Sequence, residues 1–237
     1  MVELDDRNAC VCHRCSSAPE ICSLLAHHLS RQRLHPKGVA FGHQTSGGKD
    51  FMNRVHHWIC GSNLWAKLLR EKLMPWALDG VDLGGNVLEV GPGPGLTTEV
   101  LRHRAARVTS IEIDPVLAHS LGHKLGGTNV RVIEGDATSL PFANGSFSGA
   151  VSFTMLHHVS SPALQDRLLT EVCRVLEPGA TFAGTDSTWS FALQLFHLFD
   201  TLVAVDPDTF GVRLEAAGFS DPSIDEQRGI FRFRARK

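Results

Sequence analysis

The feature that most constrains this chain is a regular alternation of short apolar runs with amphipathic segments of helical spacing, beginning near residue 86. Short runs rich in β-branched residues are typical of buried strands, and longer segments with apolar residues three and four apart are typical of helices. Strands that alternate with helices pair in parallel through right-handed crossovers and form a doubly wound sheet. The predicted strands cover residues 87–90, 108–113, 130–134, 150–153 and 180–184, and the predicted helices residues 96–103, 115–125 and 163–176.

The two ends of the chain are less regular. Residues 51–78 have helical spacing in two segments, the second of which is closed by Pro75. Residues 1–37 are rich in cysteine and histidine and suggest no core. We therefore expect a poorly ordered N-terminal extension over 1–37, a helical lid over 38–80 and the main domain over 81–237. Near the C-terminus, a helix is expected over 209–217, and the alternating residues 230–235 predict a final strand.

A glycine-rich turn, Gly91-Pro92-Gly93-Pro94-Gly95, follows the first strand. In doubly wound sheets, ligands bind outside the carboxyl ends of the strands, where the direction of winding reverses. Glycines allow a sharp bend and a close approach of ligand to backbone, and the prolines stiffen the loop. Leu96 stands where the dinucleotide-binding fingerprint requires its third glycine, which argues against that fingerprint.

Carboxylates occur at the ends of the next two strands. Glu112 follows Gly91 by about 20 residues, the spacing at which a carboxylate accepts both ribose hydroxyls. Asp136 follows the third strand, where it can accept a hydrogen bond from an exocyclic amino group such as that of adenine. For Asp136 alone, a helix cap or a turn is an equally good interpretation. Glycine and acidic residues at three successive strand ends together favour a nucleoside site.

These motifs resemble class I S-adenosylmethionine-dependent methyltransferases, in particular their type 11, small-molecule branch and its quinone-biosynthesis members. The resemblance implies a doubly wound, mostly parallel, seven-stranded Rossmann-like sheet with helices on both faces and an antiparallel final strand. One departure is Ser148-Gly149, where the family has an acidic residue at the start of the fourth strand, and we expect it to affect turn structure. The motifs are Val87–Gly95, Val108–Asp114, Gly135–Ala137 with Leu140–Phe142, Leu156–Val159 and Arg174–Ala180.

The resemblance also implies S-adenosyl-L-methionine as cofactor and assigns residues to its parts. Glu89 and the turn would line the methionine part, and Glu112 would hold the ribose. Thr154 and Met155, after the fourth strand, would face the cofactor. The implied cofactor-binding residues are Glu89, Gly91, Pro92, Gly93, Gly95, Glu112, Ile113, Asp136, Ala137, Thr154 and Met155.

No catalytic residue follows from the sequence. Methyl transfer depends mainly on positioning, and a base is needed only when the acceptor must lose a proton. His157 and His158 are the candidates, although packing against the sheet or a bond to a backbone carbonyl explains each of them equally simply. The aromatic residues that line an acceptor pocket, or else form core, are Trp58, Trp65, Trp189, Phe191, Phe196 and Phe199.

Two clusters of chemically reactive or charged residues invite functional interpretations that we do not favour. Cysteines 10, 12, 15 and 22 have poor zinc-ligand spacing, so no metal site is predicted. The basic residues of 228–237 alternate along a strand, and the simplest interpretation is a solvated face that discourages pairing at a sheet edge.

The net charge and the distribution of apolar residues limit which macromolecules and membranes this chain is expected to bind. The net charge of −2 gives no general attraction to nucleic acid, no apolar run is long enough to span a membrane, and residues 1–8 do not resemble a signal peptide. We expect a cytoplasmic methyltransferase with a small-molecule or lipid-like acceptor, no nucleic-acid partner and no stable membrane insertion. The aromatic motif that amino-methylating nucleic-acid enzymes carry after the fourth strand is missing from Ser152–Met155. The alternatives are an NAD-dependent dehydrogenase and a cofactor-binding regulatory protein without turnover.

Overall fold

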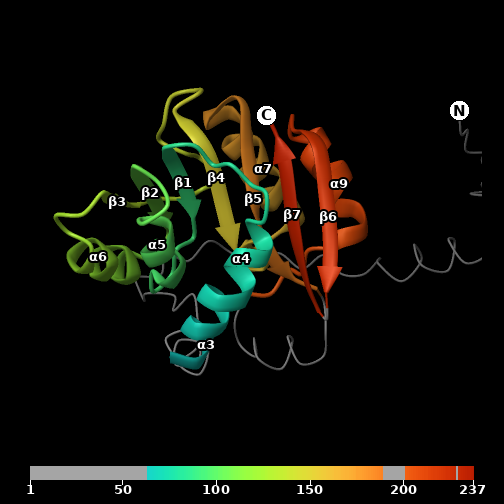
Figure 1. Ribbon diagram of the computed structural model, residues 1–237. Helices are drawn as coiled ribbons and strands as arrows, with labels where there is room; N and C mark the ends of the chain where they lie inside the picture. Colours follow the sequence, from blue (N-terminus) through green and yellow to red (C-terminus); the bar gives the residue numbers. More distant parts are fainter. Residues whose placement is uncertain (1–62, 189–200, 228) are drawn as a thin grey trace, which may run out of the picture. The chain divides into compact units, whose positions relative to one another are not determined.

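Seven strands form one sheet in the order β3-β2-β1-β4-β5-β7-β6 (Figure 1). The computed structural model describes residues 63–188, 201–227 and 229–237. The expectations for the N-terminal extension, the first part of the lid, the clustered cysteines, Trp58, Trp189 and the phenylalanines 191, 196 and 199 lie outside these residues. The strands are β1 (Asn86–Val90), β2 (Arg107–Glu112), β3 (Val130–Glu134), β4 (Phe147–Phe153), β5 (Leu176–Ser187), β6 (Ser220–Gln227) and β7 (Ile230–Arg236).

The strand directions match the predicted fold class. β1 pairs in parallel with β2 and β4, and the parallel part extends to β3 and β5. β7 runs antiparallel to both β5 and β6. Winding starts from β1 toward β3 and then resumes from β4 in the opposite direction, so the switch point lies between β1 and β4.

Helices cover both faces of the sheet because the strands are apolar on both faces (Figure 1). One core cluster joins Leu88 and Phe182 of the sheet to helices α7 and α9, and the other joins Val87 and Ala183 to α4 and α5. Neighbouring strand residues thus enter opposite cores, as the two-residue repeat of a strand requires. The helices are α3 (Asn63–Leu68), η2 (Leu69–Leu73), α4 (Met74–Ala77), α5 (Leu96–Leu101), α6 (Pro115–Lys124), η3 (Leu156–His158), α7 (Pro162–Val175) and α9 (Pro207–Ala216).

The described part of the lid, residues 63–77, is helical as expected, with one irregularity. η2 is a π-helical segment between α3 and α4. Such segments are rare and often lie at functional sites. The proposed division of the chain at residues 37 and 80 stays a prediction.

Strand β6 had no counterpart in the sequence prediction. Its residues are mostly polar, include Pro222 and remain half-buried or exposed. An edge strand accepts proline and needs no apolar alternation, so no hydrophobic pattern marks it in the sequence. Because β6 covers β7, the edge-strand interpretation of the C-terminal arginines is wrong. Arg232 instead donates to the Trp76 carbonyl oxygen at 2.7 Å and lies 5.2 Å from that indole ring, which fastens α4 to β7.

The family departure at Ser148-Gly149 has a structural explanation. The Ser148 hydroxyl accepts from the Asn86 backbone N–H at 2.9 Å and lies 3.0 Å from the Leu83 carbonyl oxygen. The backbone of Leu83 also approaches Gly149 so closely that a side chain there would collide with it. These contacts bind the segment before β1 to the amino end of β4, far from the carboxyl ends of the strands.

Candidate functional site

A cavity of about 290 Å³ opens at the carboxyl ends of the parallel strands, at the switch point. Its walls come from the turn after β1, the ends of β2 and β3, the segment after β4 and helix α7. The described residues that line it are Trp65, Leu69, Val90–Pro94, Leu96, Thr97, Ile111–Asp114, Leu117, Gly135–Thr138, Phe153–Met155, His158–Ser160, Leu164, Leu168 and Thr201.

The glycine turn forms one wall with its backbone. Gly91 and Gly93 have φ angles of +67° and +54°, which favour glycine over residues with a side chain. A Cβ at Gly91 would collide with Met155, whereas a Cβ at Gly93 would meet open space. The turn therefore exposes its main chain to the cavity at Gly93 and packs against the β4 side at Gly91.

Glu112 lies on the cavity wall at the end of β2. One carboxylate oxygen accepts from the Gly93 backbone N–H at 2.9 Å, and the other accepts from the Asp114 N–H at 3.0 Å. Burial raises the pKa of Glu112, and these backbone hydrogen bonds oppose that rise. A carboxylate has about four acceptor positions, so Glu112 keeps acceptor capacity for a ligand.

Glu89 does not line the cavity, contrary to the role assigned to it by resemblance. It is 1% exposed and accepts from the hydroxyls of Thr97, Thr98 and Ser110 at 2.6–2.7 Å. Burial raises its pKa, and the three hydroxyl donors lower it in part. Gly95 does not line the cavity either, because it begins α5 at a φ of +82° with Leu121 of α6 packed against its Cα.

Asp136 and Ala137 form the wall after β3. The Asp136 Oδ1 atom accepts from the Thr138 backbone N–H at 2.8 Å, so this carboxylate makes the turn that the sequence left open as an alternative. It also lines the cavity, next to Gly135. The turn does not exclude the predicted ligand contact, since a carboxylate has a second oxygen that can accept a hydrogen bond.

The segment after β4 contains a strained residue. Thr154 has a φ of +49°, which is unfavourable for a β-branched residue, and its N–H donates to the Thr185 carbonyl oxygen at 2.7 Å. Such strain often lies at ligand sites. Thr154 and Met155 line the cavity beside Gly91, as the resemblance implies for these positions.

The two candidate histidines have different surroundings. His157 is buried, and its Nδ1 lies 2.6 Å from Oδ1 of Asp186 at the end of β5. The other Asp186 oxygen accepts from the Leu156 N–H at 2.8 Å. His158 lines the cavity, and its ring lies 4.2 Å from that of His157. Asp186 thus fixes the segment that carries His158 to the cavity, and no sequence motif indicated it.

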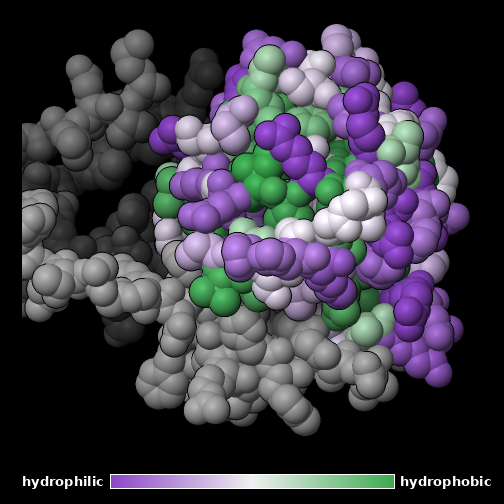
Figure 2. Space-filling model, turned by 90° about the vertical axis from the view of Figure 1, so that its left-hand side faces the viewer, coloured by the Kyte–Doolittle hydropathy of each residue, from purple (hydrophilic) through white to green (hydrophobic). Residues whose placement is uncertain are grey.

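The structure brings nine of the eleven predicted cofactor residues to one cavity; the exceptions are Glu89 and Gly95. It adds apolar residues from two helical segments, Leu69 of the π-helical η2 and Leu164 and Leu168 of α7. Ile113 and Val116 are 49% and 74% exposed near the start of α6. Figure 2, viewed from the side of β3 and α6, shows hydrophobic surface surrounded by hydrophilic residues on this face.

Residues 88–184 match the family model described as a methyltransferase domain, Methyltransf_11. Over these residues the chain is similar to methyltransferase domains. The fold agrees with this match: a solved S-adenosylmethionine-dependent methyltransferase from Aquifex aeolicus superposes with a TM-score of 0.58 at 22% identity, over 71% of this chain and 92% of that one. The prediction of a Rossmann-like methyltransferase fold is confirmed.

Curated relatives of this domain differ in their names. A probable ribosomal RNA small subunit methyltransferase A from Thermococcus onnurineus is 36% identical over 97 residues, which is 40% of this chain and 35% of that protein. A demethylmenaquinone methyltransferase from Tropheryma whipplei is 30% identical over 152 residues, 62% of this chain and 61% of that protein. The chain thus matches about one third to three fifths of the length of these relatives.

The exclusion of nucleic acid as a partner is wrong as an inference. It relied on net charge and on a missing motif after β4, yet relatives named as ribosomal RNA methyltransferases match this chain at 36% to 48% identity. Net charge averages over the whole chain and does not exclude a local nucleic-acid surface. Among the described residues, no helix is long and apolar enough to cross a membrane, and no cluster of three potential metal-ligating residues occurs. The cytoplasmic location stays a prediction.

Proposed function

We propose that this protein transfers a methyl group from S-adenosyl-L-methionine, which it binds in the cavity at the switch point. The observation that carries the proposal is the position of Glu112. Its carboxylate is held against the glycine turn by the Gly93 and Asp114 N–H groups while it lines the cavity. That arrangement presents acceptor oxygens to a ribose beside backbone that is open to a ligand.

The other walls suit the remaining parts of this cofactor. Asp136 has an acceptor oxygen for the adenine amino group, and Ile113 and Ala137 offer apolar contacts for the base. Gly91, Pro92 and Gly93 leave room for the methionine part, with Thr154 and Met155 opposite the turn. Glu89 supports this wall indirectly. It binds the hydroxyls of Thr97 and Thr98, which lie in the first turn of α5, directly after the glycine turn.

When bound, the cofactor supplies a methyl group on a positively charged sulfur. The chain contributes by holding an acceptor in line with that methyl group and by excluding water. Phe153, Leu164 and Leu168 make one side of the cavity apolar, which suits the exclusion of water. Where an acceptor must lose a proton, the imidazole of His158, which lines the cavity, is the candidate base.

For the acceptor, we propose a small apolar or lipid-like molecule. The support is the apolar wall formed by Trp65, Leu69, Val159 and Leu168, together with the match to a demethylmenaquinone methyltransferase. Ribosomal RNA is the second candidate acceptor, supported by the names of other relatives. The two candidates require different screens.

The first experiment measures binding of S-adenosylhomocysteine and of NAD to the full chain by calorimetry. Saturable binding of S-adenosylhomocysteine alone supports the proposal, whereas saturable binding of NAD alone would mean a dehydrogenase. Transfer of a radiolabelled methyl group is then measured with a panel of quinols and phenols and with unmodified ribosomal RNA. Labelled RNA with no labelled small molecule would overturn the proposed acceptor, and binding without turnover on either panel would favour a regulatory protein.

A further inference from the structure

The loop from Asp136 to Ser146 connects the cavity to the start of β4. Its first residues, Asp136 to Thr138, line the cavity. The rest runs away from the cavity, and Leu140 and Phe142 pack on the core beside Phe147. The position of the Asp136 carboxylate therefore depends on how firmly the following residues are held.

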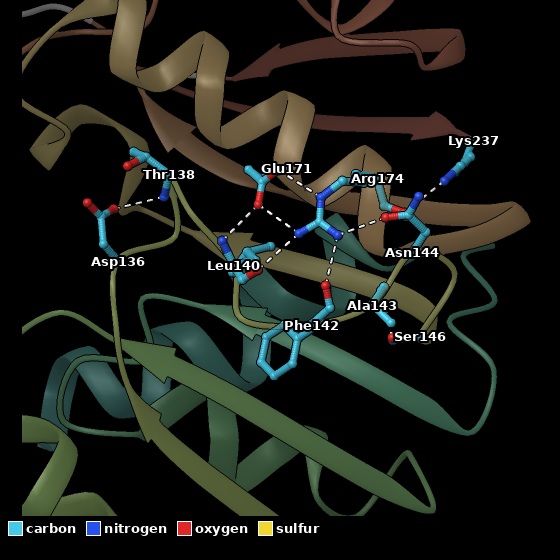
Figure 3. A network of polar contacts seen from close by, with 10 residues as sticks. All are labelled: Asp136, Thr138, Leu140, Phe142, Ala143, Asn144, Ser146, Glu171, Arg174 and Lys237. Carbon is cyan, nitrogen blue, oxygen red and sulfur yellow. Dashed lines mark hydrogen bonds and ion pairs between the residues drawn. The ribbon is translucent and has the colours of Figure 1, made fainter.

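Two side chains of α7 hold this loop (Figure 3). The Arg174 guanidinium donates to the carbonyl oxygens of Leu140 and Phe142 at 3.0 and 2.8 Å and to the Asn144 side chain at 2.9 Å. It also donates through two nitrogens to the two carboxylate oxygens of Glu171, each at 2.8 Å. Glu171 in turn accepts from the Leu140 backbone N–H at 2.8 Å. The pair thus binds both the N–H and the carbonyl group of Leu140, two residues after Thr138.

The far end of the loop is held independently by backbone groups. The N–H groups of Gly145 and Ser146 donate to the carbonyl oxygens of Arg174 and Val175 at 3.2 and 2.7 Å, and Lys237 Nζ donates to the Arg174 carbonyl oxygen. These bonds do not use the Arg174 side chain. Loss of the guanidinium therefore removes its hydrogen bonds to residues 140, 142 and 144 and leaves the entry to β4 in place.

The same face of α7 serves the cavity and the loop. Leu164 and Leu168 line the cavity, and Glu171 follows at helical spacing, with Arg174 one turn beyond it. The hydrogen bond with Arg174 lowers the pKa of Glu171, so the pair is ionised at neutral pH. Charge-assisted bonds of this bidentate kind have a fixed geometry. A single rigid helix thus sets both the apolar wall and the position of the loop.

We propose that Glu171 and Arg174 are positioning residues for recognition of the adenine base: they place Asp136 and Ala137 at the distance that an exocyclic amino group requires. The inference depends on the proposed function, because it assumes that the nucleoside of the cofactor lies against this wall. Neither side chain lines the cavity, so both act through the loop.

The test compares two probes, S-adenosylhomocysteine and S-inosylhomocysteine, in which a carbonyl oxygen replaces the amino group of adenine. The wild-type chain is expected to prefer the adenine probe by about tenfold or more, the effect of one hydrogen bond to a charged group. In Arg174→Gln this preference is expected to fall to about twofold, because Asp136 is no longer held in place. Arg174→Lys restores the charge without the two-pronged geometry, so an intermediate preference is expected.

The matched control is the ion pair between Glu99 of α5 and Arg102, the C-cap residue of the same helix. It has the same spacing of three residues and an Nη2 to Oε1 distance of 2.6 Å, and neither residue lines the cavity. Arg102→Gln is expected to keep the wild-type preference for adenine. Melting temperatures of both variants show the loss of stability caused by removing such a pair.

An unchanged adenine preference in Arg174→Gln would overturn the positioning role, even if its melting temperature fell. A wild-type chain that binds both probes equally would also overturn it. Failure of the wild-type chain to bind S-adenosylhomocysteine is a different result, because it overturns the proposed function itself. Should Arg174→Gln not fold, Glu171→Ala gives the same comparison, since it removes the acceptor of the Leu140 N–H.

Discussion

Glu89 and Glu112 lie near the ends of adjacent parallel strands, yet they have different roles. Both are buried, at 1% and 6% exposure, and burial raises the pKa of both. Glu89 pairs in register with Ser110 and binds only hydroxyls, whereas Glu112 binds backbone N–H groups and lines the cavity. Glu112 lies two residues beyond Ser110, roughly 7 Å nearer the carboxyl edge of the sheet. That offset separates a carboxylate enclosed in the core from one that lines the cavity.

The largest expected effect comes from removing the structural carboxylate. In Glu89→Leu, the hydroxyls of Thr97, Thr98 and Ser110 lose their acceptor inside the core. We expect a loss of ~3 kcal/mol in the free energy of unfolding, measured by urea denaturation. The same change at Glu112 should cost about 1 kcal/mol, because water in the cavity can reach its two N–H donors. Equal losses of unfolding free energy in the two variants would contradict the assignment of a structural role to Glu89 alone.

The second prediction concerns affinity. Glu112→Gln keeps the shape of the side chain and removes the charge that accepts ribose hydroxyls. We expect the dissociation constant of S-adenosylhomocysteine to rise roughly tenfold to a hundredfold. Glu89→Gln, measured by the same titration, should bind nearly as well as the wild type. A rise of similar size in Glu89→Gln would show that the buried carboxylate also determines the shape of the cofactor site.

The smallest expected effect is on pH dependence. A raised pKa means that the folded chain binds more protons than the unfolded chain between the ordinary value of 4.5 and the raised value. The free energy of unfolding therefore falls as the pH rises through this interval. Glu89→Gln should reduce that fall more than Glu112→Gln, because Glu89 is completely enclosed. Urea unfolding measured in steps above pH 4.5 tests this, and an identical pH dependence in both variants would contradict it.

The sequence predicted most elements to within a few residues, because their patterns are local. The helix over 115–125 is present over 115–124 and begins with Asp114, whose side chain caps it, followed by Pro115. The strand over 130–134 was located at its correct residues. Strands β4 and β5 extend beyond the predicted 150–153 and 180–184 because sheet pairing continues past their apolar centres. β6 was missed because a polar edge strand owes its existence to its partner β7.

In the candidate site too, residues with a local sequence signal were predicted, and residues placed only by tertiary packing were not. Gly91, Glu112 and Asp136 were identified because strand ends meet at one edge of a parallel sheet. Leu69, Leu164 and Leu168 were not, because an apolar residue on a helix gives no sign of which cavity it borders. Asp186 and its contacts with the 156–157 segment were likewise invisible, since the two lie about thirty residues apart in the chain.

By itself, the sequence indicated the succession of most strands and helices and the switch point, because these follow from local periodicity and from glycine and acidic residues at strand ends. The methyltransferase domain was indicated only by the resemblance of its motifs to a known family. Only the tertiary structure decided which carboxylate faces the cavity. The choice between Glu89 and Glu112 depends on how far each strand extends relative to its neighbour, and strand register is set by packing across the sheet. The same packing brings Glu171 and Arg174 to the loop that carries Asp136, a contact that spans 30 or more residues of chain.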